Sequence, residues 1–189
     1  MLENIKLCRY QDPTPIQAYC IPAVMTGHDV LACAQTGTYN LTLLSPPPPS
    51  NTETRRTGSG KTAAYLIPVL SKLMGKAKRL GAPRPRASTF RYPEDAVRAE
   101  PLVVIVVPTR ELAIQIFNEC RRMCYRSMLR PCVIYGGGPI RDQVTELSKG
   151  CDILVATPGR LKDLMNRGSV LTLNRIKLVS LKIIISCSG

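Results

Sequence analysis

Aromatic residues, histidine and acidic residues are scarce in this sequence of 189 residues. It contains no Trp, two Phe and one His, and 26 Lys and Arg outnumber 13 Asp and Glu, which gives a formal net charge of +13. Hydrophobic residues still make up 44% of the chain, so wholesale disorder is excluded and the core must be mainly aliphatic. A chain of this length has room for one domain with one sizeable core. The positive excess favours a polyanionic partner, with generic basicity as the alternative.

The chain also lacks the patterns of a metal site or a disulfide framework. None of its eight cysteines forms a Cys-x-x-Cys pair, which together with a single His argues against zinc. Several cysteines lie in apolar segments, and Cys120 and Cys124 would share one helix face, so we expect buried free thiols in a reducing compartment, cytoplasmic or nuclear. Neither a signal-like N-terminal region nor a long apolar span supports secretion or membrane insertion.

A glycine-containing stretch directly precedes an apolar helical run that extends to about Met74. Its residues are Thr57, Gly58, Ser59, Gly60, Lys61 and Thr62. The two glycines allow successive backbone N–H groups to point at phosphate oxygens, Lys61 can reach the β- and γ-phosphates, and Thr62 can offer its hydroxyl to Mg²⁺. The stretch therefore predicts a phosphate-binding loop at a helix N-terminus.

This loop is split in the sequence. The P-loop pattern expects Gly six residues before Lys61, where the chain has Arg55. A second fragment, Ala-Gln-Thr-Gly at 34–37, follows a predicted strand at Asp29–Ala34. Removal of residues 36–56 would join the two halves into Ala-Gln-Thr-Gly-Ser-Gly-Lys-Thr, between a strand and a helix, as a P-loop requires.

The inserted residues 36–56 have two interpretations. They include four consecutive prolines at 46–49, which donate no backbone hydrogen bonds. One interpretation is a tolerated surface loop, since closing a loop of this length costs roughly 3 kcal/mol in the simple chain-entropy model. The other is an unspliced in-frame intron, which the clean join inside one motif favours.

Strands alternate with helices through the rest of the chain, which predicts an α/β fold with a parallel sheet and right-handed crossovers. Thr14 is a predicted N-cap before Pro15. Residues 75–101, rich in Lys, Arg and Pro, are expected to form a basic surface insertion, solvated rather than bound to nucleic acid. Because ligands gather at the carboxyl ends of parallel strands, the loops there are candidate site residues. The predicted strands are 102–107, 132–135 and 152–156, and the predicted helices are 15–25, 111–124, 140–147 and 161–167.

Five motifs between about residues 10 and 177 occur in the order and spacing of the DEAD-box RNA helicases. Gln17 within Pro-Thr-Pro-Ile-Gln resembles the Q motif, the rejoined phosphate loop resembles motif I, and Pro-Thr-Arg-Glu-Leu-Ala-Ile-Gln at 108–115 resembles motif Ia. Gly136-Gly137 resembles the GG motif, and Thr-Pro-Gly-Arg at 157–160 resembles motif Ib. The resemblance implies a RecA-like P-loop NTPase domain over 1–189, with a mostly parallel sheet and helices on both faces. The basic insertion most resembles the Vasa/Ded1 type.

The resemblance also assigns roles. ATP and Mg²⁺ would be bound by Gln17, which reads adenine, and by the phosphate loop; Lys61 and Thr62 would be the catalytic groups, with Thr62 on the metal. Glycine N–H groups, hydroxyls and guanidinium groups suit phosphates and sugars, so RNA binding would be sequence-independent and salt-sensitive. The implied RNA contacts are Pro108, Thr109, Arg110, Gly136, Gly137, Thr157, Pro158, Gly159 and Arg160. ATP-dependent RNA unwinding or remodelling would be the activity of the intact parent.

Two departures from the family pattern affect activity. Arg55-Arg56 stands where the family has Ala-Gln, and the apolar residues 178–185 occupy the position of a last strand without an Asp-Glu-Ala-Asp run. We therefore expect a domain incomplete at its C-terminus, truncated before the DEAD motif, without hydrolysis or unwinding of its own. A non-enzymatic RNA-binding fragment is an alternative, whereas the Pro-Thr-Arg-Glu-Leu-Ala stretch argues against an unrelated P-loop kinase.

Overall fold

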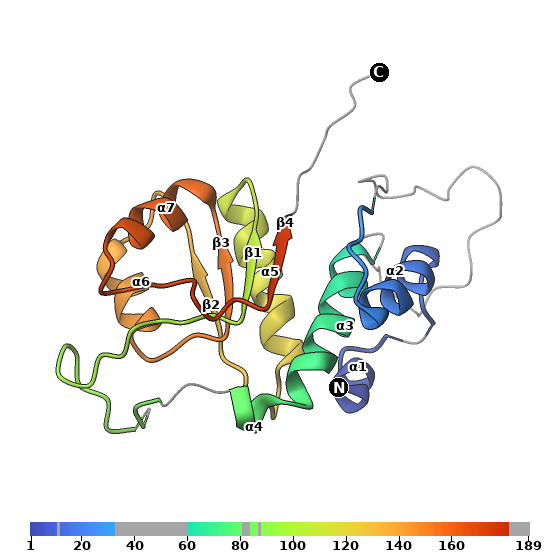
Figure 1. Ribbon diagram of the computed structural model, residues 1–189, viewed down its shortest axis with the longest axis horizontal. Helices are drawn as coiled ribbons and strands as arrows, with labels where there is room; N and C mark the ends of the chain where they lie inside the picture. Colours follow the sequence, from blue (N-terminus) through green and yellow to red (C-terminus); the bar gives the residue numbers. More distant parts are fainter. Residues whose placement is uncertain (11, 33–59, 81–83, 87, 182–189) are drawn as a thin grey trace, which may run out of the picture.

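The computed structural model describes residues 1–10, 12–32, 60–80, 84–86 and 88–181 (Figure 1). The predictions for residues 36–56, and for Thr57, Gly58 and Ser59, therefore lie outside the described residues. Within the described ranges, no helix has the length and apolar character needed to cross a bilayer. The same ranges hold no group of three or more His, Cys, Asp or Glu residues arranged for a metal ion.

In the described residues, four strands form a wholly parallel sheet at the centre of the molecule. The strands lie in the order β2-β3-β1-β4. The central strands β1 and β3 are unbroken apolar runs, Val-Val-Ile-Val and Ile-Leu-Val-Ala, because both faces of a central parallel strand are buried. The strands predicted at 102–107, 132–135 and 152–156 are thus confirmed, and the apolar segment after Lys177 does supply a strand. Their bounds are β1 (Val103–Val106), β2 (Pro131–Ile134), β3 (Ile153–Ala156) and β4 (Leu178–Leu181).

Helices cover both faces of this sheet (Figure 1). On one face, α3 (Lys61–Met74) and α5 (Arg110–Met123) pack on alternate side chains of the strands, such as Ile105. On the other, α6 (Ile140–Leu147) and α7 (Pro158–Asn166) pack on the intervening side chains. This two-faced burial is the consequence of the period-two alternation of a strand, and the chain has the RecA-like α/β fold that its motifs implied.

Local signals place the start of α2 correctly. Helix α2 (Pro15–Thr26) begins directly after Thr14, whose backbone N–H donates to Gln17 Oε1 at 3.1 Å, a capping arrangement that satisfies one of the orphan donors. A further helix, α1 (Leu2–Leu7), was not predicted. Its buried Asn4 donates to the backbone oxygens of Met123 and Tyr125 at 2.7 and 2.8 Å. Helix α1 is therefore held by a distant part of the chain rather than by its own sequence pattern.

Free thiols account for the described cysteines. Cys20, Cys120, Cys124, Cys132 and Cys151 are buried and Cys8 is partly buried, all without disulfides. Burial raises the pKa of the Cys120 thiol well above its ordinary value and that of Cys124 to about 12. The Cys120 and Cys124 thiols are therefore protonated, packed side chains at neutral pH.

The basic insertion at 75–101 is only partly a solvated loop. It contains a short helix, α4 (Ala77–Leu80), and Ala99 is fully buried in a bridge to Leu171. The expectation of a solvated chain is wrong for Arg84, which forms an ion pair with Asp152. That carboxylate is 2% exposed and also accepts a hydrogen bond from the backbone N–H of Arg130 at 2.6 Å. A buried carboxylate requires such partners, and this one draws Arg84 of the insertion onto the sheet.

The predicted strand at Asp29–Ala34 is wrong over its described part. Residues 29–32 form no ladder, and the side chain of Leu31 is 94% exposed. A strand is stabilised by pairing and by side-chain packing on a sheet face, and here both are missing. In the rejoined sequence Ala34 would lead straight into the phosphate loop and α3, whereas in this chain residues 36–56 intervene.

Candidate nucleotide site and nucleic-acid interface

The start of α3 is joined to α2 by a glutamine. Gln17 is 3% exposed, and its Nε2 donates to the backbone oxygen of Gly60 at 3.1 Å. Gly60 has φ of +70°, a conformation that L side chains rarely adopt. A Cβ there would lie 2.5 Å from Gln17 Nε2 and 2.7 Å from Thr14 Oγ1. The structure thus brings together Gln17, Gly60, Lys61 and Thr62, which the sequence predicted for one site.

This arrangement fits a nucleoside triphosphate with Mg²⁺. The helix dipole at the first turn of α3 favours a phosphate, and the absence of a side chain at Gly60 keeps the backbone close to α2. Lys61 and Thr62 are the first two residues of the helix. At this position the Lys61 ammonium would bind phosphate and the Thr62 hydroxyl would bind the metal ion. Gln17 Oε1 accepts a hydrogen bond from the Thr14 N–H, and Gln17 Nε2 donates one to the Gly60 oxygen. A primary amide has one further acceptor position and one further N–H for a purine edge.

A second cluster forms where β1, β2 and β3 end. The Arg110 guanidinium carbon lies 4.8 Å from the centroid of the Tyr135 ring, within cation–π range. The backbone N–H of Gly136 donates to Thr157 Oγ1 at 3.3 Å, and Arg160 Nη2 donates to the backbone oxygen of Gly138 at 3.3 Å. The loops that carry motifs Ia and Ib therefore each contact the loop that carries the GG motif, and we call these three loops the carboxyl edge.

Helix N-termini position two of the three loops. Thr109 caps α5 by accepting a hydrogen bond from the backbone N–H of Leu112 at 3.3 Å, so exposed Arg110 is the first helical residue. Thr157 is the N-cap of α7 and Pro158 its first residue. The prediction that 157–160 is a loop before a helix at Leu161 is therefore wrong: proline at the first helical position lacks only an N–H that needs no partner there.

Arg160 is held unlike Arg110. Its side chain is 13% exposed and its Nε lies 3.9 Å from Asp163 Oδ2. Its Nη1 is buried and has no hydrogen-bond partner among the described residues. An unsatisfied guanidinium nitrogen beside a glycine loop and a helix N-terminus is a donor suited to an anion. The carboxyl edge thus combines one exposed and one largely buried guanidinium with backbone donors.

Two residues of this edge were missed by the sequence analysis. Tyr135 follows β2 and carries the ring beneath Arg110. Gln143 in α6 is buried, and its Oε1 accepts from Tyr135 N while its Nε2 donates to Tyr135 O, both at 3.1 Å. The available signal for Gln143 was its place in the first turn of an amphipathic helix, at a position where an apolar core residue is usual.

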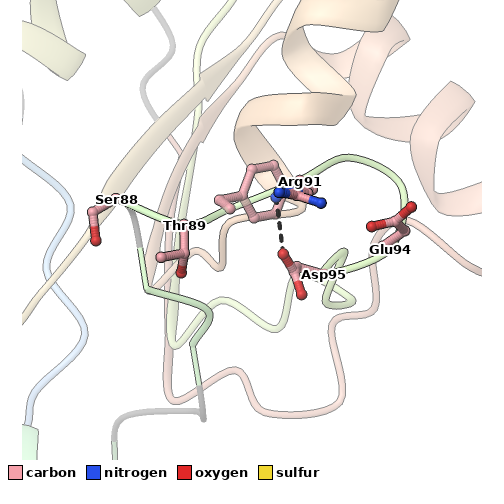
Figure 2. A pocket seen from close by; sticks show the side chains of 6 residues that line it. Ser88, Thr89, Arg91, Glu94 and Asp95 are labelled. Atoms are coloured by element: carbon pink, nitrogen blue, oxygen red, sulfur yellow. Dashed lines mark hydrogen bonds between the residues drawn. The ribbon is translucent and has the colours of Figure 1, made fainter.

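A separate hollow lies in the segment that leads into the amino end of β1 (Figure 2). The backbone N–H of Arg91 donates to Asp95 Oδ2 at 2.9 Å across this turn. No predicted site residue takes part in it. The lining residues are Ser88, Thr89, Phe90, Arg91, Glu94 and Asp95.

Comparison with known families agrees with this geometry. Residues 54–185, more than half of the chain, match the family model described as DEAD/DEAH box helicase. The chain belongs to the DEAD/DEAH box helicase family. Helicases of this family are ATP-dependent, generally need Mg²⁺ and bind nucleic acid. The matched range contains Gly60–Thr62 and all three loops of the carboxyl edge, whereas Gln17 lies before it.

Proposed function

We propose that this chain is the ATP-binding and RNA-binding domain of a DEAD-box RNA helicase. The observation that carries the proposal is the carboxyl edge itself: three loops from three adjacent strands meet through Arg110 on Tyr135, Gly136 on Thr157 and Arg160 on Gly138. Ligands bind at this end of a parallel sheet. The phosphate loop before α3 supplies the nucleotide site of the same domain.

The donors of the carboxyl edge suit an RNA backbone rather than bases. Arg110 and Arg160 offer guanidinium groups, and the exposed Gly137 offers a backbone N–H group. Such groups contact phosphates and sugars and carry no sequence information. With a net charge of +13, the chain should bind single-stranded RNA without sequence preference and with a strong salt dependence.

The nucleotide would be held by the groups gathered at α3. In this proposal Gln17 contacts adenine, Lys61 binds the β- and γ-phosphates, and Thr62 ligates Mg²⁺. ATP supplies the phosphoryl group whose cleavage drives remodelling in such helicases. Within the family, the basic insertion at 75–101 supports a Vasa/Ded1-type assignment, and the free thiols support a reducing location, cytoplasmic or nuclear.

Substitution of Arg110 by Ala tests the RNA site. We expect RNA affinity to fall about tenfold, and the slope of log K against log salt to become shallower by about 0.7, since one phosphate contact is lost. Fluorescence anisotropy of a labelled single-stranded RNA over a salt series measures both. Arg91→Ala is the control of equal charge, because Arg91 lies on the turn of Figure 2. Equal effects of the two substitutions would mean that charge alone, not this edge, binds RNA.

Hydrolysis by the 189 residues alone should be negligible. They contain no Asp-Glu-Ala-Asp run, so no carboxylate pair is available to hold the metal and orient the attacking water. A malachite-green assay with saturating RNA is expected to give the rate of the protein-free blank. RNA-stimulated phosphate release that Lys61→Ala abolishes would overturn this expectation.

A non-enzymatic RNA-binding fragment is the second candidate. It is favoured by the same lack of a DEAD run beside a complete carboxyl edge. Anisotropy with and without ATP and Mg²⁺ separates the two candidates. Nucleotide-dependent RNA affinity supports the ATP-binding domain, and RNA affinity that ignores nucleotide supports the fragment.

A further inference from the structure

We propose that Gln143 is a positioning residue for RNA binding, which acts by holding Tyr135 and the glycine loop that follows it. This inference rests on the proposed function of the carboxyl edge. Gln143 belongs to none of the motifs that suggested that function. The Gln143 side chain extends from α6 to the loop after β2 and hydrogen-bonds the backbone of Tyr135. Arg110 and Arg160, by contrast, would contact RNA with their charged groups.

The contact is a double hydrogen bond to one residue. Gln143 Oε1 accepts from Tyr135 N and Gln143 Nε2 donates to Tyr135 O, both at 3.1 Å. Tyr135 lies just beyond β2, where no further ladder bond is available from that strand. The amide therefore replaces a strand partner and satisfies both backbone groups of Tyr135, as buried polar groups require.

Close packing extends this control to the glycines. A Cβ on Gly138 would lie 2.9 Å from Tyr135 Cε2 and 3.1 Å from Gln143 Nε2. The loop between them turns through Gly137 at φ of +76°, which glycine adopts without strain. The side chains of Tyr135 and Gln143 thus pack directly against the glycine loop.

The Tyr135 side chain also positions the exposed guanidinium of Arg110. The Tyr135 ring lies 4.8 Å from the guanidinium carbon of Arg110. Rotation or withdrawal of the ring would release Arg110, a long side chain that loses rotamer freedom when it is held. Gln143 therefore preorganises one charged contact and one set of backbone donors, which raises affinity without touching RNA.

Gln143→Leu tests this assignment, because leucine has a similar size and no hydrogen-bonding group. We expect about tenfold weaker RNA binding and faster hydrogen exchange in the peptide that contains Tyr135–Gly138. In a double-mutant cycle with Arg110→Ala, the added loss from Gln143→Leu should be smaller than its loss in the wild type, since the part of its effect that passes through the Tyr135 ring to Arg110 is already gone. Asn118→Leu, a comparable amide-to-leucine change at an exposed position of α5, should alter neither quantity.

A merely structural role would give different results. It predicts a lower melting temperature, faster exchange throughout the sheet, and a loss of RNA affinity that adds in full to that of Arg110→Ala. Gln143→Glu is the second variant: it keeps the acceptor for Tyr135 N but places a carboxylate against Tyr135 O, so affinity should again fall with the fold retained. If the wild type binds RNA and both variants bind it with unchanged affinity, the inference is overturned. A wild type that binds no RNA would overturn the proposed function instead, and exchange at Tyr135–Gly138 would still show whether Gln143 holds the loop.

Discussion

Gly60→Ala is expected to lower the free energy of unfolding by about 3 kcal/mol and to weaken nucleotide binding at least tenfold. A residue with a Cβ in the left-handed conformation loses roughly 1–2 kcal/mol, and Gly60 has φ of +70°. The added Cβ would also meet Gln17 Nε2 at 2.5 Å and Thr14 Oγ1 at 2.7 Å, and such overpacking costs roughly another 1–3 kcal/mol. Urea denaturation and titration with a fluorescent ATP analogue measure the two effects.

Gly27→Ala is the matched control for that substitution. Gly27 ends α2 with φ of +99°, but a Cβ there has nothing within 4 Å. It should therefore show only the conformational penalty, about 1 kcal/mol, and normal nucleotide affinity. If the two alanine variants lose equal stability and both bind nucleotide normally, the packing of Gln17 against Gly60 has no role in the site.

Deletion of residues 36–56 is expected to raise affinity for ATP with Mg²⁺ about a hundredfold. The deletion joins Ala34-Gln35 to the Thr57–Thr62 stretch, which removes a loop-closure penalty of roughly 3 kcal/mol and the Arg55-Arg56 pair. It also brings Asp29–Ala34 within reach of the sheet. In the described residues β4 is the last strand of the order β2-β3-β1-β4, so a strand beside it would extend the sheet toward α3.

A second variant separates length from composition. Replacement of residues 36–56 by an equally long Gly/Ser segment keeps the two halves apart and should leave affinity low. High affinity in this variant would mean that the prolines or arginines of the insert, rather than the split, impair binding. No gain in the deletion variant would contradict the split-motif hypothesis. Sequencing of the mature transcript across codons 36–56 then decides between an intron and a surface loop.

The parts of the fold that follow from local chemistry were predictable. Thr14 and Pro15 begin α2, and the apolar run around Ile105 is a buried strand. Both features depend on residues that are adjacent in the sequence, the capping residues in one case and a continuous apolar run in the other. The error at Pro158 has the same origin: a proline counted as a loop residue is also a good first residue of a helix.

What sequence patterns missed depends on distant partners. Asn4 secures α1 through carbonyl oxygens more than a hundred positions away, and Arg84 is drawn from the insertion by the buried Asp152. In the candidate site, motifs supplied Arg110, Gly136 and Arg160, but Gln143 gave no such signal. Its role follows only from its two bonds to the backbone of Tyr135, a contact that no spacing of residue types predicts.

Hydrogen exchange of the intact chain with and without single-stranded RNA tests the central claim most directly. The account predicts RNA-dependent protection at the carboxyl edge, in peptides that contain Thr109–Leu112, Gly136–Gly138 and Thr157–Leu161. The basic segment 84–100, at the amino end of β1, should change little. Protection confined to that basic segment, or none at the carboxyl edge under saturating RNA, would contradict the account and leave net charge as the only basis for binding.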